Sequence, residues 1–164
     1  MKSTDSFNDK NKTNVMRVLD SKKISYESHS YEPDATMTGV EIANILGEDP
    51  AKVFKTLVTQ GKSGAYYVFV VPVEAELDLK KAAKACAEKA VSMIKQKDLF
   101  PLTGYVHGGC SPIGMKKPFP TFIHETAMQY ERMFVSAGKV GYQIELSPKD
   151  LLFVTGCKIA DLCL

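Results

Sequence analysis

The chain has 164 residues, of which 45% are hydrophobic and 24% are charged, and its formal net charge is +2. This length argues for one domain, and this composition can bury a core, which excludes a largely disordered chain. No apolar run reaches the roughly 18 residues of a membrane-spanning helix, and the weak net charge excludes a strongly basic nucleic-acid coat protein.

The N-terminal segment is polar. Residues 1–12 carry no hydrophobic periodicity and no apolar stretch typical of a secretory signal. We therefore expect a disordered tail over residues 1–12, a single domain over residues 13–164, and a cytoplasmic protein. Asn14 can cap a short helix with apolar positions between 15 and 19, and a strand is expected over 24–31.

The next elements have clear boundary signals. Thr38 and Glu41 have the spacing of a capping box, and Gly47 can end the helix that follows them. Residues 53–59 and 65–73 are rich in β-branched and aromatic residues and flank a short glycine-containing turn. This pattern predicts a β-hairpin.

The second half alternates helices and short strands. Asp78 can cap a helix, and Ser147 followed by Pro148 begins another, which Gly156 can end. Between them lie a Gly- and Pro-rich segment, residues 103–120, and expected strands over 121–124, 133–136 and 143–146. The sequence therefore predicts an α+β domain with a mainly antiparallel, mixed sheet and surrounding helices.

Lys55 is the most informative single residue. It lies in the apolar run 53–59, so its ammonium group must be paired, reach solvent or meet a ligand. The alternative is a lysine that protects an edge strand against aggregation, and the pattern alone does not decide between the two.

The Gly108-Gly109 pair is the second candidate. Two glycines let the backbone approach a ligand closely and direct N–H groups at an anion, although a tight turn explains the same pair. His29 and Tyr31 share a strand face, where they can line a pocket or form a half-buried pair.

The four cysteines and three histidines do not have zinc-ligand spacing, so we expect no metal and no cofactor. Cys110 lies in the glycine-rich segment. Without an identifiable base beside it, we interpret Cys110 as a packed thiol rather than a nucleophile; a small-molecule hydrolase that uses Cys110 is a third, weaker hypothesis.

Taken together, several segments resemble the YbaK/EbsC family of free-standing aminoacyl-tRNA deacylases, which are related to the editing domain of prolyl-tRNA synthetase. The resemblance runs from about residue 14 to 162. It is carried by residues 29–32 (HSYE), 53–58 (VFKTLV), 77–84 (LDLKKAAK), 103–114 (TGYVHGGCSPIG) with Lys116 and Lys117 after it, and 135–139 (VSAGK).

The resemblance implies a partly barrel-like YbaK fold and a trans-editing activity in translation fidelity that removes cysteine from Cys-tRNA(Pro), and also from Cys-tRNA(Cys). In the cysteine-specific branch the substrate's own thiol attacks its ester. The enzyme is then classified as a hydrolase or a lyase. The implied partners are the 3′ end of aminoacylated tRNA and prolyl-tRNA synthetase.

The resemblance also assigns roles to individual residues. Lys55 and Gly108 match the catalytic positions. Tyr31, Thr56, Gly109 and Ser136 match positions that bind the substrate.

Two positions depart from the cysteine-specific pattern. Thr38 stands where a phenylalanine is usual, and Gln143 stands where an aspartate is frequent. Clearing of Ala-tRNA therefore stays open, as does a non-catalytic module that binds tRNA or a nucleotide and regulates a partner.

Overall fold

The computed structural model describes residues 12–34 and 36–164. The expected tail therefore lies outside the described residues, apart from Lys12, which forms an ion pair with Asp20 at 2.5 Å. Within the described ranges the helices are α1 (Asn14–Ser21), α2 (Gly39–Ile45), α3 (Leu79–Ala85), α4 (Leu99–Thr103) and α5 (Pro148–Thr155), with the 3-10 helices η2 (Gln96–Asp98) and η3 (Glu125–Gln129). The strands are β1 (Glu27–Ser30), β2 (Phe54–Gly61), β3 (Tyr66–Pro72), β4 (Val91–Met93), β5 (Thr121–His124), β6 (Met133–Ser136), β7 (Tyr142–Leu146) and β8 (Lys158–Ala160).

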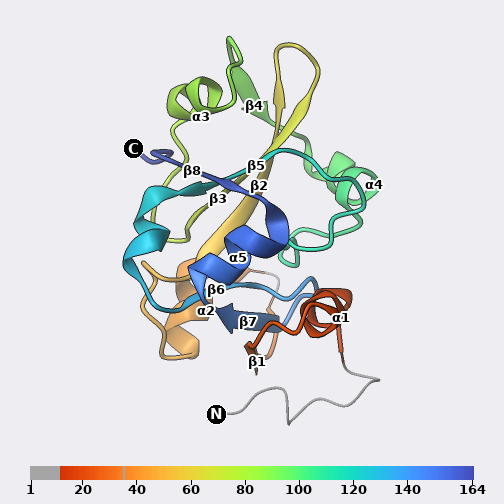
Figure 1. The fold of residues 1–164 in the computed structure, drawn as a ribbon, viewed down its shortest axis with the longest axis vertical. Helices are drawn as coiled ribbons and strands as arrows, with labels where there is room; N and C mark the ends of the chain where they lie inside the picture. The colour runs from red at the N-terminus through yellow and green to blue at the C-terminus, as the bar shows by residue number, and fades with distance from the viewer. Residues whose placement is uncertain (1–11, 35) are drawn as a thin grey trace.

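The strands form two sheets. A three-stranded antiparallel sheet has the order β1-β7-β6, and a five-stranded mixed sheet has the order β4-β2-β3-β5-β8, in which β5 is parallel to both neighbours. The small sheet lies with α1 and α2 at one end of the molecule, and the tip of the β2–β3 hairpin lies with α3 and β4 at the other (Figure 1). The predicted α+β class with a mixed sheet is confirmed, but the sheets do not close into a barrel.

The two sheets meet where β2 begins. Val53 forms an isolated parallel bridge with Phe134, and the backbone N–H of Phe134 donates to the carbonyl of Lys52 at 3.0 Å. This junction brings the start of β2 to β6, although the two segments are about 80 residues apart in sequence.

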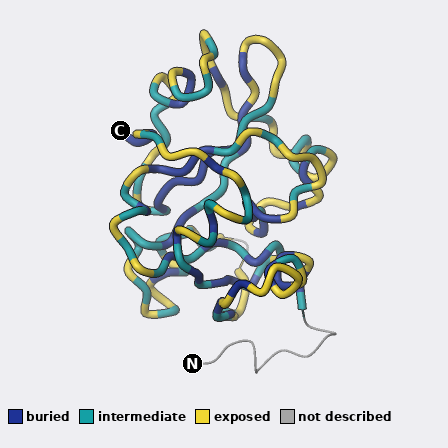
Figure 2. The backbone as a smooth tube through the Cα atoms, in the orientation of Figure 1, coloured by how far each residue is buried: buried dark blue, intermediate teal, exposed yellow. Residues whose placement is uncertain are grey.

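Two hydrophobic cores lie on opposite faces of the β2–β3 hairpin. Phe54 and Val58 belong to the larger core, which also receives α1 and the inner face of the small sheet. Phe69 and Val71 belong to the smaller core, which is covered by α3 and the C-terminal segment. The buried backbone therefore runs through the centre of the molecule, and the exposed backbone gathers at the hairpin tip and outer loops (Figure 2).

Most predicted helix boundaries are confirmed. Thr38 and Glu41 form the complete capping box, Asp78 caps α3, and Ser147 caps α5. The prediction for the first helix was wrong by one residue, because Thr13, rather than Asn14, accepts the hydrogen bond from the Met16 amide.

Five short elements were not predicted from the sequence, and one strand was predicted too long. β4, α4, β8 and the 3-10 helices η2 and η3 have three to five residues each, too few for hydrophobic periodicity to stand out. β1 spans Glu27–Ser30 and not 24–31, because only these residues pair with β7. No helix among the described residues is long and apolar enough to cross a membrane.

Candidate functional site

Lys55 lies partly buried on β2 with its ammonium group unpaired. Strand alternation puts its side chain on the face of Leu57 and of the smaller core. Within residues 12–34 and 36–164 it has no hydrogen bond and no ion pair, and its charge acts to lower the pKa of Cys163. β4 pairs only with the far end of β2, so at Lys55 the strand has β3 on one side alone. A partly buried lysine without a partner among the described residues is suited to an anionic ligand.

The junction of the two sheets brings the strand segments of Ser136 and Lys55 together. Lys55 follows Val53 by two residues, and Ser136 follows Phe134 by two residues in the same direction. Because the bridge is parallel, both side chains are directed to the same face as Val53 and Phe134. The Ser136 hydroxyl oxygen accepts a hydrogen bond from the Gly138 amide at 3.1 Å, which shapes the turn between β6 and β7.

Three further predicted site residues lie next to the β6–β7 turn. The Tyr31 amide donates to the Gly141 carbonyl at 2.9 Å. A Cβ on Gly109 would lie 2.9 Å from the Val140 nitrogen, and Gly108 has φ +88° and also faces Val140. The structure thus brings Tyr31, Gly108 and Gly109 to the turn that begins at Ser136.

Two neighbouring grooves run past this turn. One has a volume of about 600 Å³ and is lined by Tyr31, Glu32, Pro33 and residues 139–142, with Ser30 at its edge. The other, of about 710 Å³, shares Glu32 and Pro33 with the first and extends to residues 36–45 of α2 and the segment before it. A ligand at the turn would therefore have space on the α2 side.

Thr56 is placed differently from the other predicted site residues. It alternates with Lys55, so its side chain is on the face of Phe54 and Val58, in the larger core. Its hydroxyl oxygen is buried and has no hydrogen-bond partner among the described residues. The structure does not bring the Thr56 side chain to the face of Lys55 and Ser136.

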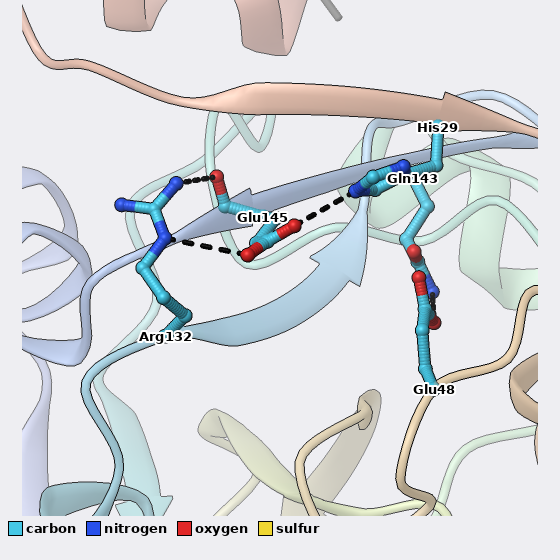
Figure 3. Close-up of polar contacts among 5 residues, drawn as sticks. All are labelled: His29, Glu48, Arg132, Gln143 and Glu145. Carbon is cyan, nitrogen blue, oxygen red and sulfur yellow. Dashed lines mark hydrogen bonds and ion pairs between the residues drawn. The ribbon is translucent and has the colours of Figure 1, made fainter. Parts of the chain in front are cut away.

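The outer face of the small sheet carries a chain of polar contacts. The register places Gln143 between His29 and Ser136. The Gln143 amide nitrogen donates to Glu48 Oε1 at 2.9 Å, and His29 Nε2 lies 2.9 Å from Glu145 Oε1 (Figure 3). The contacts continue from Glu145 to an arginine. Arg132 Nε lies 3.4 Å from Glu145 Oε2, and its Nη2 donates to the Glu145 carbonyl at 3.0 Å.

The electrostatics of this face centre on Glu48. The pKa of Glu48 is raised from 4.5 to about 7, mainly by burial and to a smaller extent by the nearby charge of Glu145. The hydrogen bond from Gln143 and the charge of His29 act in the opposite direction. Glu48 therefore titrates in the physiological range.

Sequence reasoning missed Glu48, Glu145 and Arg132. The alternation of Glu27 with His29 and of Gln143 with Glu145 was a visible signal of a polar sheet face. Glu48 had no such signal, because only the tertiary structure brings the turn after α2 to β7. His29 makes both a packing contact and a polar contact. Its ring centroid lies 5.8 Å from that of Phe134, and its Nε2 lies 2.9 Å from Glu145 Oε1.

A potential cation-binding group lies on the same face. Ligand atoms of Glu27, His29 and Glu145 lie within 4.8 Å of one another. Both carboxylate oxygens of Glu145 already contact His29 and Arg132, so a cation would have to displace an existing partner. The absence of a metal cofactor stays a prediction.

The Cys110 thiol is poorly suited to nucleophilic attack. Burial raises its pKa to about 12, so the reactive thiolate form is scarce near neutral pH. This supports the interpretation of Cys110 as a packed side chain.

Known proteins match this chain over most of its length. The aminoacyl-tRNA editing domain family matches residues 33–154. EbsC of Enterococcus faecalis, provisionally named a Cys-tRNA(Pro)/Cys-tRNA(Cys) deacylase, is 45% identical over 152 residues, which cover 92% of this chain and 93% of EbsC. The proline–tRNA ligase of Fervidobacterium nodosum is 25% identical over 99 residues, which cover 60% of this chain and 17% of the ligase.

The fold is also similar to solved structures. A crystal structure described as that of a candidate trans-editing enzyme for prolyl tRNA synthetase has a TM-score of 0.80 and 27% identity, covering 93% of this chain and 98% of that one. The sequence match and the fold agree over nearly the whole length. This chain belongs to the aminoacyl-tRNA editing domain family.

Proposed function

We propose that this protein is an aminoacyl-tRNA deacylase that removes cysteine from mischarged Cys-tRNA(Pro). Family membership and the name of the Enterococcus faecalis relative support this substrate class. The single observation that carries the proposal is the Lys55 ammonium, which has no hydrogen-bond or ion-pair partner among the described residues, on the strand that meets β6 at the Val53–Phe134 bridge. We assign this cation to a phosphate of the terminal nucleotide or to the negative charge that develops on the ester carbonyl.

The proposed reaction needs no protein nucleophile. The cysteine sulfur of the substrate attacks its own ester carbonyl, a C–S bond forms and the C–O bond to the ribose breaks. The thiol proton ends on the ribose oxygen, so the products are a thiolactone and deacylated tRNA. The protein then has to orient the ester and stabilise charge.

The remaining assignments belong to the same proposal. Tyr31 and Ser136 would contact the aminoacyl or ribose group, while Gly108 and Gly109 let the backbone approach the ester. Thr56 would act through its backbone or its unsatisfied hydroxyl, because its side chain is on the core face of β2. Prolyl-tRNA synthetase is the proposed protein partner, in line with the match to the Fervidobacterium ligase.

Replacement of Lys55 by alanine tests the proposal. We expect Lys55→Ala to lower the rate of cysteine release from Cys-tRNA(Pro) on the order of 100-fold or more, because one charge-stabilising group is lost. Lys62→Ala is the matched control, since Lys62 is exposed in the turn of the same hairpin. The measurement is release of labelled amino acid from Cys-tRNA(Pro) and from Ala-tRNA(Pro).

The possible outcomes separate the alternatives. Loss of cysteine release in Lys55→Ala alone supports the proposal. Release of alanine in place of cysteine would show that the substrate is Ala-tRNA and not Cys-tRNA. Tight tRNA binding without release of either amino acid contradicts the enzyme and favours a non-catalytic binding module.

A further inference from the structure

Charge is distributed unevenly along this chain, although the net charge is only +2. Residues 27–49 contain no lysine or arginine, and their acidic side chains are Glu27, Glu32, Asp34, Glu41, Glu48 and Asp49. In residues 95–117 the charged side chains are Lys95, Lys97, Asp98, Lys116 and Lys117. The acidic segment includes β1 and α2, whereas the lysine-rich segment includes η2 and α4, which lie well away from α2 (Figure 1). The molecule therefore has an acidic side and a basic side.

The lysines of the second segment lie at the two ends of α4. Lys95 and Lys97 belong to the η2 turn, which leads directly into α4. The Lys116 amide donates to the carbonyl of Thr103, the last residue of α4, at 2.9 Å, so Lys116 and Lys117 lie at the other end. α4 has five residues and is therefore about 7.5 Å long. This length is within the screening distance of roughly 8–10 Å at moderate salt, so the two lysine pairs act on the same stretch of a polyanion.

These four lysines are available to bind an anion. All are exposed, and none of their side chains has a hydrogen bond or ion pair within the part of the chain that the structure describes. Phe100, in α4 between the two pairs, is 59% exposed. An exposed aromatic ring among cations is typical of surfaces that bind unpaired nucleotides. We use the name lysine surface for Lys95, Lys97, Phe100, Lys116 and Lys117.

The lysine surface adjoins the candidate site through the glycine loop. The Lys116 amide contact closes residues 103–116 into one loop, in which a Cβ on Gly109 would lie 2.9 Å from the Val140 nitrogen of the β6–β7 turn. The acidic side chains that line the larger groove beside this turn are Glu32, Asp34 and Glu41. A chain of phosphates that leaves the site is therefore attracted on the α4 side and repelled on the α2 side.

We propose that the lysine surface binds the phosphate backbone of the tRNA acceptor end, so that the RNA leaves the site across α4 and not across α2. This inference rests on the proposed deacylase function and deepens it, because it assigns the face on which the tRNA lies. Each lysine that neutralises a phosphate releases a bound counterion, so the affinity decreases as the salt concentration rises. Such contacts position the RNA without reading its sequence.

The experiment measures the dissociation constant of deacylated tRNA(Pro) over a range of KCl concentrations. The two variants are Lys95→Gln with Lys97→Gln, and Lys116→Gln with Lys117→Gln. We expect each to weaken binding on the order of 10-fold at moderate salt. Each should also reduce the slope of log Kd against log salt concentration by about 1.5, since one phosphate contact contributes roughly 0.7 to 0.9 to that slope.

The matched control is Lys80→Gln with Lys84→Gln, which makes the same change in charge at exposed positions of α3. This control should keep the wild-type affinity and slope. Release of cysteine from cysteinyl-adenosine, an ester without phosphates, is measured for every protein. We expect wild-type rates from all of them, because the lysine surface has no phosphate to bind in this substrate.

Each contrary result is distinguishable. Wild-type affinity and slope in both lysine-surface variants overturn the inference, while the deacylase function stands. An equal loss in the α3 control also overturns it, because tRNA affinity then depends on net charge and not on this surface. Variants that keep tRNA affinity but lose binding to prolyl-tRNA synthetase identify a protein interface instead of an RNA interface.

Two further outcomes separate the inference from the proposed function. If the lysine-surface variants lose activity on cysteinyl-adenosine, the lysines act on the fold or the site rather than on phosphates, and the inference is overturned. Wild type that binds tRNA with the expected lysine dependence, yet releases no cysteine from either ester, overturns the proposed function and supports the lysine surface as a tRNA-binding face.

Discussion

The chemistry of individual residues on the small sheet is decided by what packs over them. Gln143 and His29 would be ordinary polar side chains on an exposed strand. Here Gln143 is buried and bonded to Glu48, and His29 lies between Phe134 and Glu145. The same burial places the titration of Glu48 near pH 7. Stability should therefore depend on pH through this residue.

Glu48 is predicted to make the fold less stable as pH rises. Its pKa is raised from 4.5 to about 7, so the folded chain binds the proton more tightly than the unfolded chain. The free energy of unfolding therefore decreases between about pH 4.5 and pH 7 and then levels off. Glu48→Gln removes this contribution. Since one pKa unit corresponds to about 1.4 kcal/mol and Glu48 is partly exposed, we expect the variant to be more stable at pH 8 by on the order of 1–2 kcal/mol.

Urea denaturation at pH 5 and pH 8 measures this effect. The difference between wild type and Glu48→Gln should grow from the lower to the higher pH, whereas Glu131→Gln, at an exposed position, should follow wild type at both. Parallel pH profiles for wild type and Glu48→Gln would show that Glu48 titrates normally.

The helices and strands are individually short, and their ends depend on local hydrogen bonds. α2 has seven residues, and its first turn is closed by both halves of the capping box. The Thr38 amide donates to Glu41 Oε1 at 2.8 Å, and the Glu41 amide donates to Thr38 Oγ1 at 3.1 Å. The Thr38 side chain is exposed and occupied by this cap, so we assign it to the stability of α2 and not to contact with an amino acid.

Thr38→Ala is expected to lower the free energy of unfolding by about 1 kcal/mol, because the cap hydroxyl is lost. Thr38→Ser retains the hydroxyl and should stay within a few tenths of a kcal/mol of wild type. Chemical denaturation of the three proteins side by side measures the difference. Equal stability of the alanine and serine variants would contradict the role of the cap.

At the scale of the whole molecule, the candidate site exists because distant segments meet at one turn. The loop with Gly109 contacts the turn at Val140, the Tyr31 amide donates to the Gly141 carbonyl, and β2, which carries Lys55, meets β6 at the Val53–Phe134 bridge. The loop can lie this close because Gly109 has no side chain, while Gly108 adopts φ +88°, a conformation that favours glycine. A small side chain at this contact should therefore disturb the site.

Gly109→Ala tests this contact. The new methyl group would lie 2.9 Å from the Val140 nitrogen, which is backbone and cannot rotate away, so the loop must shift. We expect kcat/KM for the aminoacyl-tRNA to fall by about 10-fold or more, since small displacements of positioning groups are costly. Gly64→Ala is the control: Gly64 has φ +98° at the hairpin tip and no atoms near the added methyl, so it should lose stability and keep kcat/KM. Equal activity losses in both variants would mean that the effect is global destabilisation.

The accuracy of prediction from the sequence differs between elements. The β2–β3 hairpin and the caps at Thr38, Asp78 and Ser147 were predicted correctly, because their signals lie within a few neighbouring residues. The cap of α1 was assigned one residue late, because Thr13 and Asn14 are both good capping residues and adjacent in sequence. β8 was missed because three residues are too few to show a strand pattern.

The sequence by itself determined the α+β class, the hairpin that carries Lys55 and the glycine loop, since periodicity, capping residues and turn residues are local properties of the chain. Only the tertiary structure decided that Glu48 faces Gln143, that Thr56 is on the core face, and that Tyr31 and Gly109 share one turn. These contacts join residues that are 31 to 110 positions apart or depend on which face of a strand is buried. Burial and long-range register are properties of the packed molecule, because they arise when separate hydrophobic faces exclude water together.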